Sequence, residues 1–317
     1  MSATNSLLVE RMVTGQADGR RQSAELVTDP GLLGLRRLVV PTSVGYVVVH
    51  VGREAGGPAT ILLHGAAGSW TTWSPLLAES DRVGRPLTDV VAVDLPGWGE
   101  SAASASIDEV GDLTDAIVEI AAALGYRHWS VLGHSLGGLV ALDLAVRAPH
   151  ATVSVGLVSP SGAGVLDAIR RPLRGGRRLP GLAGMLVAMR ALAPFGAAGR
   201  ALIRGLHRVG LLAPLSRPLF ARPASIHPSV IDALSHEIRP GAFAQAARIA
   251  KRYRTEAWSA VRCPVRSVRG ADDVFAGERD WALFAGLIAD YRELRLENAG
   301  HFAGIEAPTA TLAFLRG

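Results

Sequence analysis

The sequence predicts an α/β fold built on a mostly parallel sheet, and three observations support this prediction. Short apolar runs alternate with helical patterns over most of the 317 residues, and this alternation places helices on both faces of a parallel sheet. Hydrophobic residues make up 49% of the chain, enough for a large buried core. One long stretch, 161–260, interrupts the alternation with helical patterns alone, which indicates an inserted cap.

The predicted strands are short, and they begin with a hairpin. Leu35–Val40 and Val44–Val51 form a strand pair that turns at residues 41–43. The later strands are expected at Thr60–Leu63, Val90–Val93, Trp129–Leu132, Val153–Val158, Val265–Val268 and Leu294–Leu296.

The clearest helix is predicted over Ser106–Leu124, where apolar residues recur at spacings of three and four. Ser106 and Glu109 have the S-x-x-E spacing of a capping box at its start. Further helices are expected at Leu136–Ala148, Arg279–Ala289 and Ala307–Leu315.

These elements divide the chain into three parts. Residues 1–35 show little periodicity and are predicted to be a loose N-terminal leader. Residues 36–160 and 261–317 are predicted to form the α/β core. Residues 161–260 are predicted to form a helical cap, in which prolines separate short helices.

The chain is basic, with a net charge of +5, and much of the excess arginine falls between Arg170 and Arg222. No aromatic residues interleave with these arginines to stack on bases, so nucleic-acid binding is not expected. A solvated helix face is favoured for them over contact with an anionic or membrane-surface substrate.

The remaining composition limits where the protein is expected to work. Cys263 is the only cysteine, which excludes an intrachain disulfide and fits a cytoplasmic protein. The N-terminal residues lack a continuous apolar run, so no signal peptide is predicted. Glycine, proline and arginine interrupt the later apolar stretches, so no transmembrane segment is expected. The oligomeric state is not predicted.

A candidate nucleophile lies in Gly133-His134-Ser135-Leu136-Gly137, which fits G-x-S-x-G. A strand precedes this motif and a helix follows it, so the chain must turn abruptly and leave Ser135 at the tip. The helix start also places a positive dipole beside the serine. His134 is predicted to be structural and not the base.

Backbone amides are the candidate oxyanion donors. His64-Gly65-Ala66-Ala67-Gly68 follows the strand Thr60–Leu63, and a loop of small residues there can aim an N–H at a carbonyl oxygen. The predicted pair is Ala66 N–H and Leu136 N–H.

A serine hydroxyl needs a base, and the base needs a carboxylate to fix its tautomer. His301 is the best of the nine histidines, because it lies between the last strand and the last helix. Asp273 follows the strand Val265–Val268 and is the preferred acid, with Asp272 as the alternative. The order Ser, Asp, His along the chain is the one expected for such a fold.

These motifs together resemble the α/β-hydrolase superfamily. The matching segments also include 94–101, 133–138, 270–273 and 300–302, in the family order. The resemblance implies an eight-stranded, mostly parallel sheet with a helical lid after the sixth strand. It implies hydrolysis without a metal or organic cofactor, and the serine at the elbow argues against epoxide opening and halide displacement.

The expected activity is cleavage of a small apolar carboxylic ester or lactone through an acyl-enzyme. Carbon–carbon bond hydrolysis, perhydrolysis and a non-catalytic binding role are the alternatives. Trp70 and Trp73 could border the pocket or pack in the core. Five apolar cap residues could roof the pocket or simply pack the cap: Leu182, Met185, Leu186, Met189 and Leu192.

Overall fold

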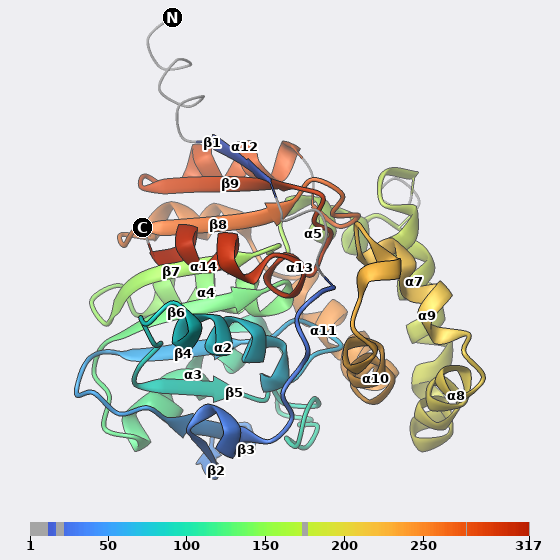
Figure 1. The fold of residues 1–317 in the computed structure, drawn as a ribbon, viewed down its shortest axis with the longest axis horizontal. Helices are drawn as coiled ribbons and strands as arrows, with labels where there is room; N and C mark the ends of the chain where they lie inside the picture. The colour runs from blue at the N-terminus through green and yellow to red at the C-terminus, as the bar shows by residue number, and fades with distance from the viewer. Residues whose placement is uncertain (1–11, 17–21, 173–176, 277, 317) are drawn as a thin grey trace, which may run out of the picture.

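The computed structural model describes residues 12–16, 22–172, 177–276 and 278–316. Within them, nine strands form one sheet in the order β1-β9-β8-β7-β6-β4-β5-β3-β2 (Figure 1). Strands β2 to β9 are the predicted eight, which confirms the mostly parallel α/β architecture. Their bounds are β2 Leu35–Thr42, β3 Gly45–Gly52, β4 Ala59–Leu63, β5 Val90–Val93, β6 Trp129–His134, β7 Thr152–Val158, β8 Val265–Gly270 and β9 Tyr291–Glu297.

The direction of the strands changes at β5. Strands β2 and β3 form an antiparallel hairpin, and β3 also pairs antiparallel with β5. All pairs from β5 through β4, β6, β7 and β8 to β9 are parallel. The carboxyl ends of the parallel strands therefore meet along one edge, where side chains from distant segments can come together.

The N-terminal segment differs from the loose leader that the sequence predicted. Strand β1, Met12–Gln16, pairs parallel with β9 and extends the sheet by one strand. Farther on, Leu26 is buried and its N–H donates to Ser229 Oγ in the cap. Edge pairing uses backbone groups alone, so this five-residue strand leaves little trace in the side-chain pattern.

Helices cover both faces of the sheet, as expected. On one face, α2 packs against α14 and α13; on the other, α3 packs against α4, and α12 lies beside β9. Each face has its own large apolar cluster, with Leu139 in one and Leu76 in the other. The core helices are α2 Ser74–Arg82, α3 Val110–Ala123, α4 Leu136–Arg147, α12 Glu278–Leu287, α13 Ala303–Glu306 and α14 Pro308–Arg316, and the short 3-10 turns are η1 Pro30–Leu33 and η2 Trp70–Trp73.

Helix α3 begins one turn later than the sequence predicted. Its capping box joins Glu109 to Asp112, so Ser106 is not the cap. The Asp112 carboxylate accepts hydrogen bonds from the N–H groups of Asp108 and Glu109. A carboxylate so placed satisfies the exposed N–H groups at the start of a helix, and a serine farther upstream is not needed.

A group of helices is inserted between β7 and β8 and lies beside the carboxyl edge of the sheet (Figure 1). The last of its elements, η6, packs on α4 and α12 of the core, and Trp258 within η6 is fully buried. The inserted elements are α5 Ala163–Arg170, α7 Pro180–Leu192, η3 Ala193–Phe195, α8 Gly196–Arg208, α9 Leu212–Ser216, η4 Arg217–Leu219, η5 Pro223–Ser225, α10 Pro228–Glu237, α11 Pro240–Ala250 and η6 Thr255–Ala260.

Two charged side chains at the α10–α11 junction fasten this cap to a core loop. Arg239 donates to the carbonyl oxygens of Gly97 and Gly99, and Glu237 accepts from the Gly99 N–H. Gly99 has a φ of 53° and adjoins the Asp94 carboxylate, which leaves no room for a side chain. The cap is therefore held against the loop that follows β5.

Candidate active site

The chain turns directly from β6 into α4 at Ser135. Its φ of 51° and ψ of −114° are strained for a residue with a side chain. The Ser135 N–H donates to Val158 O, and the Ser135 carbonyl accepts from the N–H groups of Gly138 and Ser161. These hydrogen bonds offset the strain and hold the serine at the tip of the turn, as the G-x-S-x-G motif predicted.

Glycines let the surrounding backbone approach this turn. A Cβ on Gly137 would collide with the carbonyl oxygen of Leu63 at the end of β4, and one on Gly133 would collide with Gly137 itself. A Cβ on Gly65 would lie 2.8 Å from the Ser135 Cβ. The motif glycines are therefore required because backbone segments meet here without space for side chains.

The structure brings Ser135, His301 and Asp273 together in one hydrogen-bonded row. His301 Nε2 lies 3.0 Å from Ser135 Oγ, and His301 Nδ1 lies 3.0 Å from Asp273 Oδ1. An ionised carboxylate can only accept, so Nδ1 carries the proton and Nε2 is left to accept from the serine hydroxyl. This is the relation between nucleophile, base and orienting acid that acyl-transfer chemistry requires.

The geometry also separates the two candidate acids. Asp273 is 7% exposed and lies in contact with the imidazole, whereas Asp272 is exposed. Burial works against ionisation of Asp273, but the neighbouring His301 and the Phe275 N–H, 2.9 Å from Oδ1, hold the pKa of this carboxyl below its usual value. Asp273 is therefore ionised at neutral pH.

Two other buried histidines surround the site and stay neutral. Burial lowers the pKa of His64 to about 4 and that of His134 to about 3. His64 Nε2 accepts from the Leu95 N–H, and His134 Nε2 lies 3.1 Å from the His301 carbonyl oxygen. The side chain of His134 thus supports the backbone of the His301 loop, which agrees with its predicted structural role.

The sequence did not reveal how the cap holds the His301 loop. The His301 N–H donates to Leu219 O in the cap, at 2.9 Å. The Glu306 carboxylate accepts from Gly300 N–H in this loop and from Ala221 N–H in the cap. Burial raises the pKa of Glu306. A glutamate at the end of a short helix carries no motif, so only the folded chain shows that it joins the two parts.

The predicted oxyanion donors are the backbone N–H groups of Ala66 and Leu136. Ala66 and Leu136 both border the cavity in front of Ser135. Leu136 is the first residue of α4, and among the described residues neither amide donates to another protein group. Both N–H groups are thus free to bind an oxygen in the cavity.

A cavity of about 530 Å³ opens beside Ser135 and His301, a volume typical of sites for small organic molecules. Its described lining contains no charged side chain; the polar groups are three serines and His301. The five cap residues singled out from the sequence all line it. Trp70 and Trp73 do not: both are buried in the core cluster around α2.

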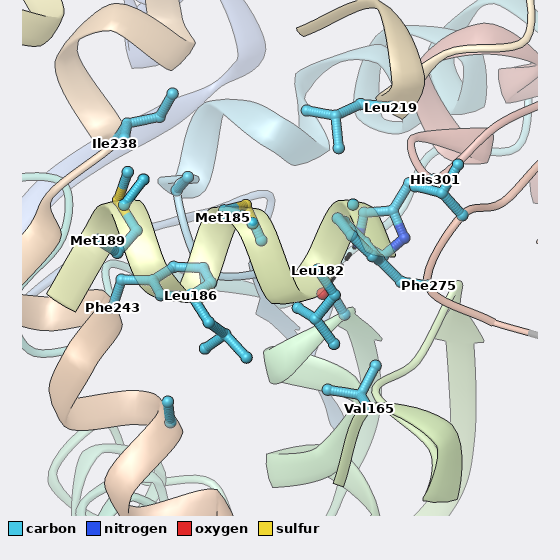
Figure 2. Close-up of a pocket in the computed structure, with 18 of the residues that line it drawn as sticks. Val165, Leu182, Met185, Leu186, Met189, Leu219, Ile238, Phe243, Phe275 and His301 are labelled. Atoms are coloured by element: carbon cyan, nitrogen blue, oxygen red, sulfur yellow. Dashed lines mark hydrogen bonds between the residues drawn. The ribbon is translucent and has the colours of Figure 1, made fainter. Parts of the chain in front are cut away.

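The cavity is elongated along α7. In Figure 2, Leu182 and Phe275 lie beside His301, while Met189, Ile238 and Phe243 lie at the other end of the helix. Among the residues that the structure describes, no group of three or more histidine, cysteine or acidic side chains could hold a metal ion. The reactive side chains at this end of the cavity are the Ser135 hydroxyl, the His301 imidazole and the Asp273 carboxylate behind it.

The alpha/beta hydrolase family model matches residues 60–314 of the chain. This match spans the elbow at Ser135, the cap and the loop of His301. The chain belongs to the alpha/beta hydrolase family. The family match agrees with the sheet order and with the helical insertion after β7.

Curated relatives match only part of this chain. A stretch of 120 residues is 38% identical to the dihydrolipoyllysine-residue acetyltransferase component of the acetoin cleaving system of Cupriavidus necator, covering 37% of this chain and 30% of that protein. A putative carbamate hydrolase of Agrobacterium fabrum is 32% identical over 104 residues, covering 32% of this chain and 38% of that protein. The chain thus spans about a third of the length of these relatives.

Solved structures resemble the chain over most of its length. The carboxylesterase CesB of Bacillus subtilis has a TM-score of 0.65 at 19% identity, covering 90% of this chain and 94% of that one. A hydrolase of Pseudomonas aeruginosa has a TM-score of 0.68 at 19% identity, covering 88% of this chain and 97% of that one. At such identity these similarities show the fold alone.

Replacing Gly137 with alanine should destabilise the fold. The new Cβ would overlap with the carbonyl oxygen of Leu63, which belongs to the sheet and cannot move aside. We therefore expect a loss of about 3 kcal/mol in the free energy of unfolding. Urea titration measures this loss. Gly286→Ala is the matched control: it lies in α12 with no atom near its Cβ position and should be neutral or stabilising. Equal stability of the two variants would contradict the steric interpretation.

Proposed function

We propose that this hydrolase cleaves apolar carboxylic esters or lactones through an acyl-enzyme. Ser135 is the nucleophile, His301 the base, and Asp273 the acid that orients it. The observation that carries the proposal is the hydrogen-bonded row of these three groups, which opens into an apolar cavity. The match to a hydrolase family supports the same conclusion.

The first half of the reaction forms the acyl-enzyme. As Ser135 Oγ attacks the ester carbonyl, its proton passes to His301 Nε2, and the imidazolium is stabilised by Asp273. The negative charge that develops on the carbonyl oxygen is bound by Ala66 N–H and Leu136 N–H. The intermediate then collapses: the bond to the leaving oxygen breaks, and His301 returns the proton to that oxygen to release the alcohol.

The second half hydrolyses the acyl-enzyme. Water attacks the Ser135 ester while His301 Nε2 takes one of its protons, and the same two amides bind the oxyanion. When this intermediate collapses, the bond to Ser135 Oγ breaks and His301 gives the proton back to the serine. The acid leaves the cavity, and the hydroxyl is ready for another cycle.

The cavity supports an uncharged, apolar substrate. A charged group would have to leave water for a lining that offers no opposite charge, and the free energy of this desolvation is strongly unfavourable. The side chains from α7, α11 and the β8–α12 loop form an apolar channel that leads away from the serine, and an acyl chain fits this shape (Figure 2). The channel therefore favours esters with an extended hydrocarbon group.

Replacing Ser135 with alanine should abolish ester hydrolysis without unfolding the protein. The hydroxyl is the attacking group, and its loss removes the acyl-enzyme route; in other enzymes with this triad, such losses reach about 10⁶-fold in kcat. Hydrolysis of 4-nitrophenyl butyrate measures the loss, and circular dichroism checks the fold. A folded variant that retains its turnover would refute the assignment of the nucleophile.

The two neighbouring aspartates provide a matched test of the orienting acid. Asp273→Asn should reduce kcat by about 10⁴-fold, because an amide no longer holds the reactive tautomer of His301 or stabilises its charged form. Asp272→Asn changes the same charge on an exposed side chain and should leave kcat near that of the unmodified protein. Similar kcat values for the two variants would show that Asp273 does not act through His301.

Residues at the far end of the cavity should set the acceptable chain length. Met189→Trp fills this end, so kcat/KM for 4-nitrophenyl decanoate should fall about tenfold or more while that for the acetate changes little. Val187→Trp, on the same helix but 67% exposed, is the control and should change neither value. A Met189→Trp variant with equal losses for both esters would contradict a channel for the acyl chain.

A further inference from the structure

Large apolar side chains gather on the outside of the cap. Six of the eleven large hydrophobic side chains that are exposed among the described residues fall within 187–215, although this stretch is a small part of the chain. Their exposed fractions run from 51% to 69%. They are Val187, Phe195, Leu202, Val209, Leu211 and Leu215.

The helices that carry these residues are apolar on two sides. Leu186, Met189 and Ile203 face inward and line the cavity, which accounts for one side of α7 and α8. Helices α7, α8 and α9 form the layer of the cap farthest from the sheet (Figure 1). Leu215 also borders the cavity. Packing and substrate binding therefore explain the inner side chains, but neither explains the other five outer ones.

The segment that contains this layer is strongly basic, and four of its arginines lie on α7 and α8: Arg190, Arg200, Arg204 and Arg208. Between residues 168 and 231 the sequence contains eleven arginines and no lysine, aspartate or glutamate. This segment carries +11 of a chain whose total is +5, so the remaining residues carry −6. Arg190, Arg200 and Arg208 are exposed among the outer apolar side chains. The molecule thus presents a positive, apolar cap opposite a negative core, and such a charge asymmetry orients a protein toward an anionic surface.

We propose that the outer face of α7, α8 and α9 docks on the surface of a bilayer that contains anionic lipids. Arginine side chains would pair with the lipid phosphates, while the phenylalanine, leucine and valine side chains enter the boundary between headgroups and acyl chains. Both kinds of side chain contribute at such a surface. The arginines attract the protein to the anionic lipids, and the apolar side chains hold it in the interface. The site is separate from the triad and does not depend on its chemistry.

The helices lie on the bilayer and do not cross it. The stretch Pro180–Arg208 is long and apolar enough, by length and composition, to span a membrane. It is interrupted, however, by the η3 turn, where Gly196 has a φ of 49°, and its buried side chains form the cavity wall. A straight span would remove that wall and would place Arg190 and Arg200 in hydrocarbon. An interfacial position keeps both the cavity and the hydration of the arginines.

Two other occupants fit the surface less well. A second copy of this chain, packed through the same face, would bring together two groups of arginines on helices that contain no carboxylate of their own. The phosphates of a nucleic acid would pair with the arginines. The exposed aliphatic side chains would gain no contact, however, because bases stack on aromatic rings. A lipid surface uses both kinds of side chain.

The test is sedimentation of the full chain with vesicles. We expect the protein to sediment with vesicles of phosphatidylcholine and phosphatidylglycerol, and much less with phosphatidylcholine alone. Added salt should weaken the binding without abolishing it, because only the electrostatic part is screened. Ser135→Ala should bind vesicles as well as the unmodified chain does. Vesicle binding therefore tests the docking surface even if the chain proves not to hydrolyse esters.

Two sets of variants separate the contributions, each with a control on the core. V187S/F195S/V209S and R190Q/R200Q/R208Q should each weaken vesicle binding by about tenfold or more. The controls L32S/Y46S/V153S and R127Q/R262Q/R292Q change exposed residues of the same kinds outside the cap and should bind as the unmodified chain does. Unchanged thermal unfolding in all four shows that the fold is intact.

Three outcomes would overturn the proposal. The first is vesicle binding that is equal for both lipid mixtures or absent from both. The second is binding that responds to the arginine variant but not to the apolar variant, with a duplex oligonucleotide competing for the protein; this would indicate a nucleic-acid surface. The third is a dimer in gel filtration that the apolar variant dissociates, because the outer face would then be covered by a second copy.

Discussion

The close passage of β4 beneath the turn from β6 into α4 is the contact on which the active site depends. Gly137 lies against the carbonyl of Leu63, and Gly65 lies against Ser135, so these close backbone contacts position the loop after β4 relative to Ser135. The strained backbone of Ser135 persists because β4 and β7 pair with β6 directly before it and helix α4 begins directly after it. Rigid sheet edges thus give the precision that a loop alone could not provide.

The imidazole of His301, the proposed base, is positioned in a different way, since His301 lies on a loop that the cap helps to hold. Leu219 accepts from the His301 N–H, and Glu306 receives hydrogen bonds from both the cap and the loop. A change in the cap near Leu219 would therefore reach the imidazole through the backbone. The Ser135 turn is built on strand β6 and helix α4 of the core, whereas the His301 loop is also hydrogen-bonded to the cap. The cap therefore helps to set the geometry of the Ser135–His301–Asp273 row as well as forming the cavity wall.

What the sequence could predict follows from how local each constraint is. The elbow and the order of Ser135, Asp273 and His301 were predictable, because glycines at fixed spacing and residues after strands report on backbone geometry. The choice between Asp272 and Asp273 was not settled, because neighbours in a turn differ only in the direction that the folded loop gives them. Glu306 and strand β1 could not be found from the sequence. Glu306 accepts hydrogen bonds from backbone groups that are distant along the chain, and β1 joins the sheet only by edge pairing.

The cap shows a further limit of sequence periodicity. An apolar stripe marks a helix face that avoids water, but it does not say what covers that face. On α7, Met189 faces the cavity and Val187 faces outward, so both kinds of residue appear in a stretch that reads simply as apolar. Only the position of the helix between the cavity and the surface separates the two roles. The proposed substrate channel and the proposed docking surface thus lie on opposite sides of the same layer of helices.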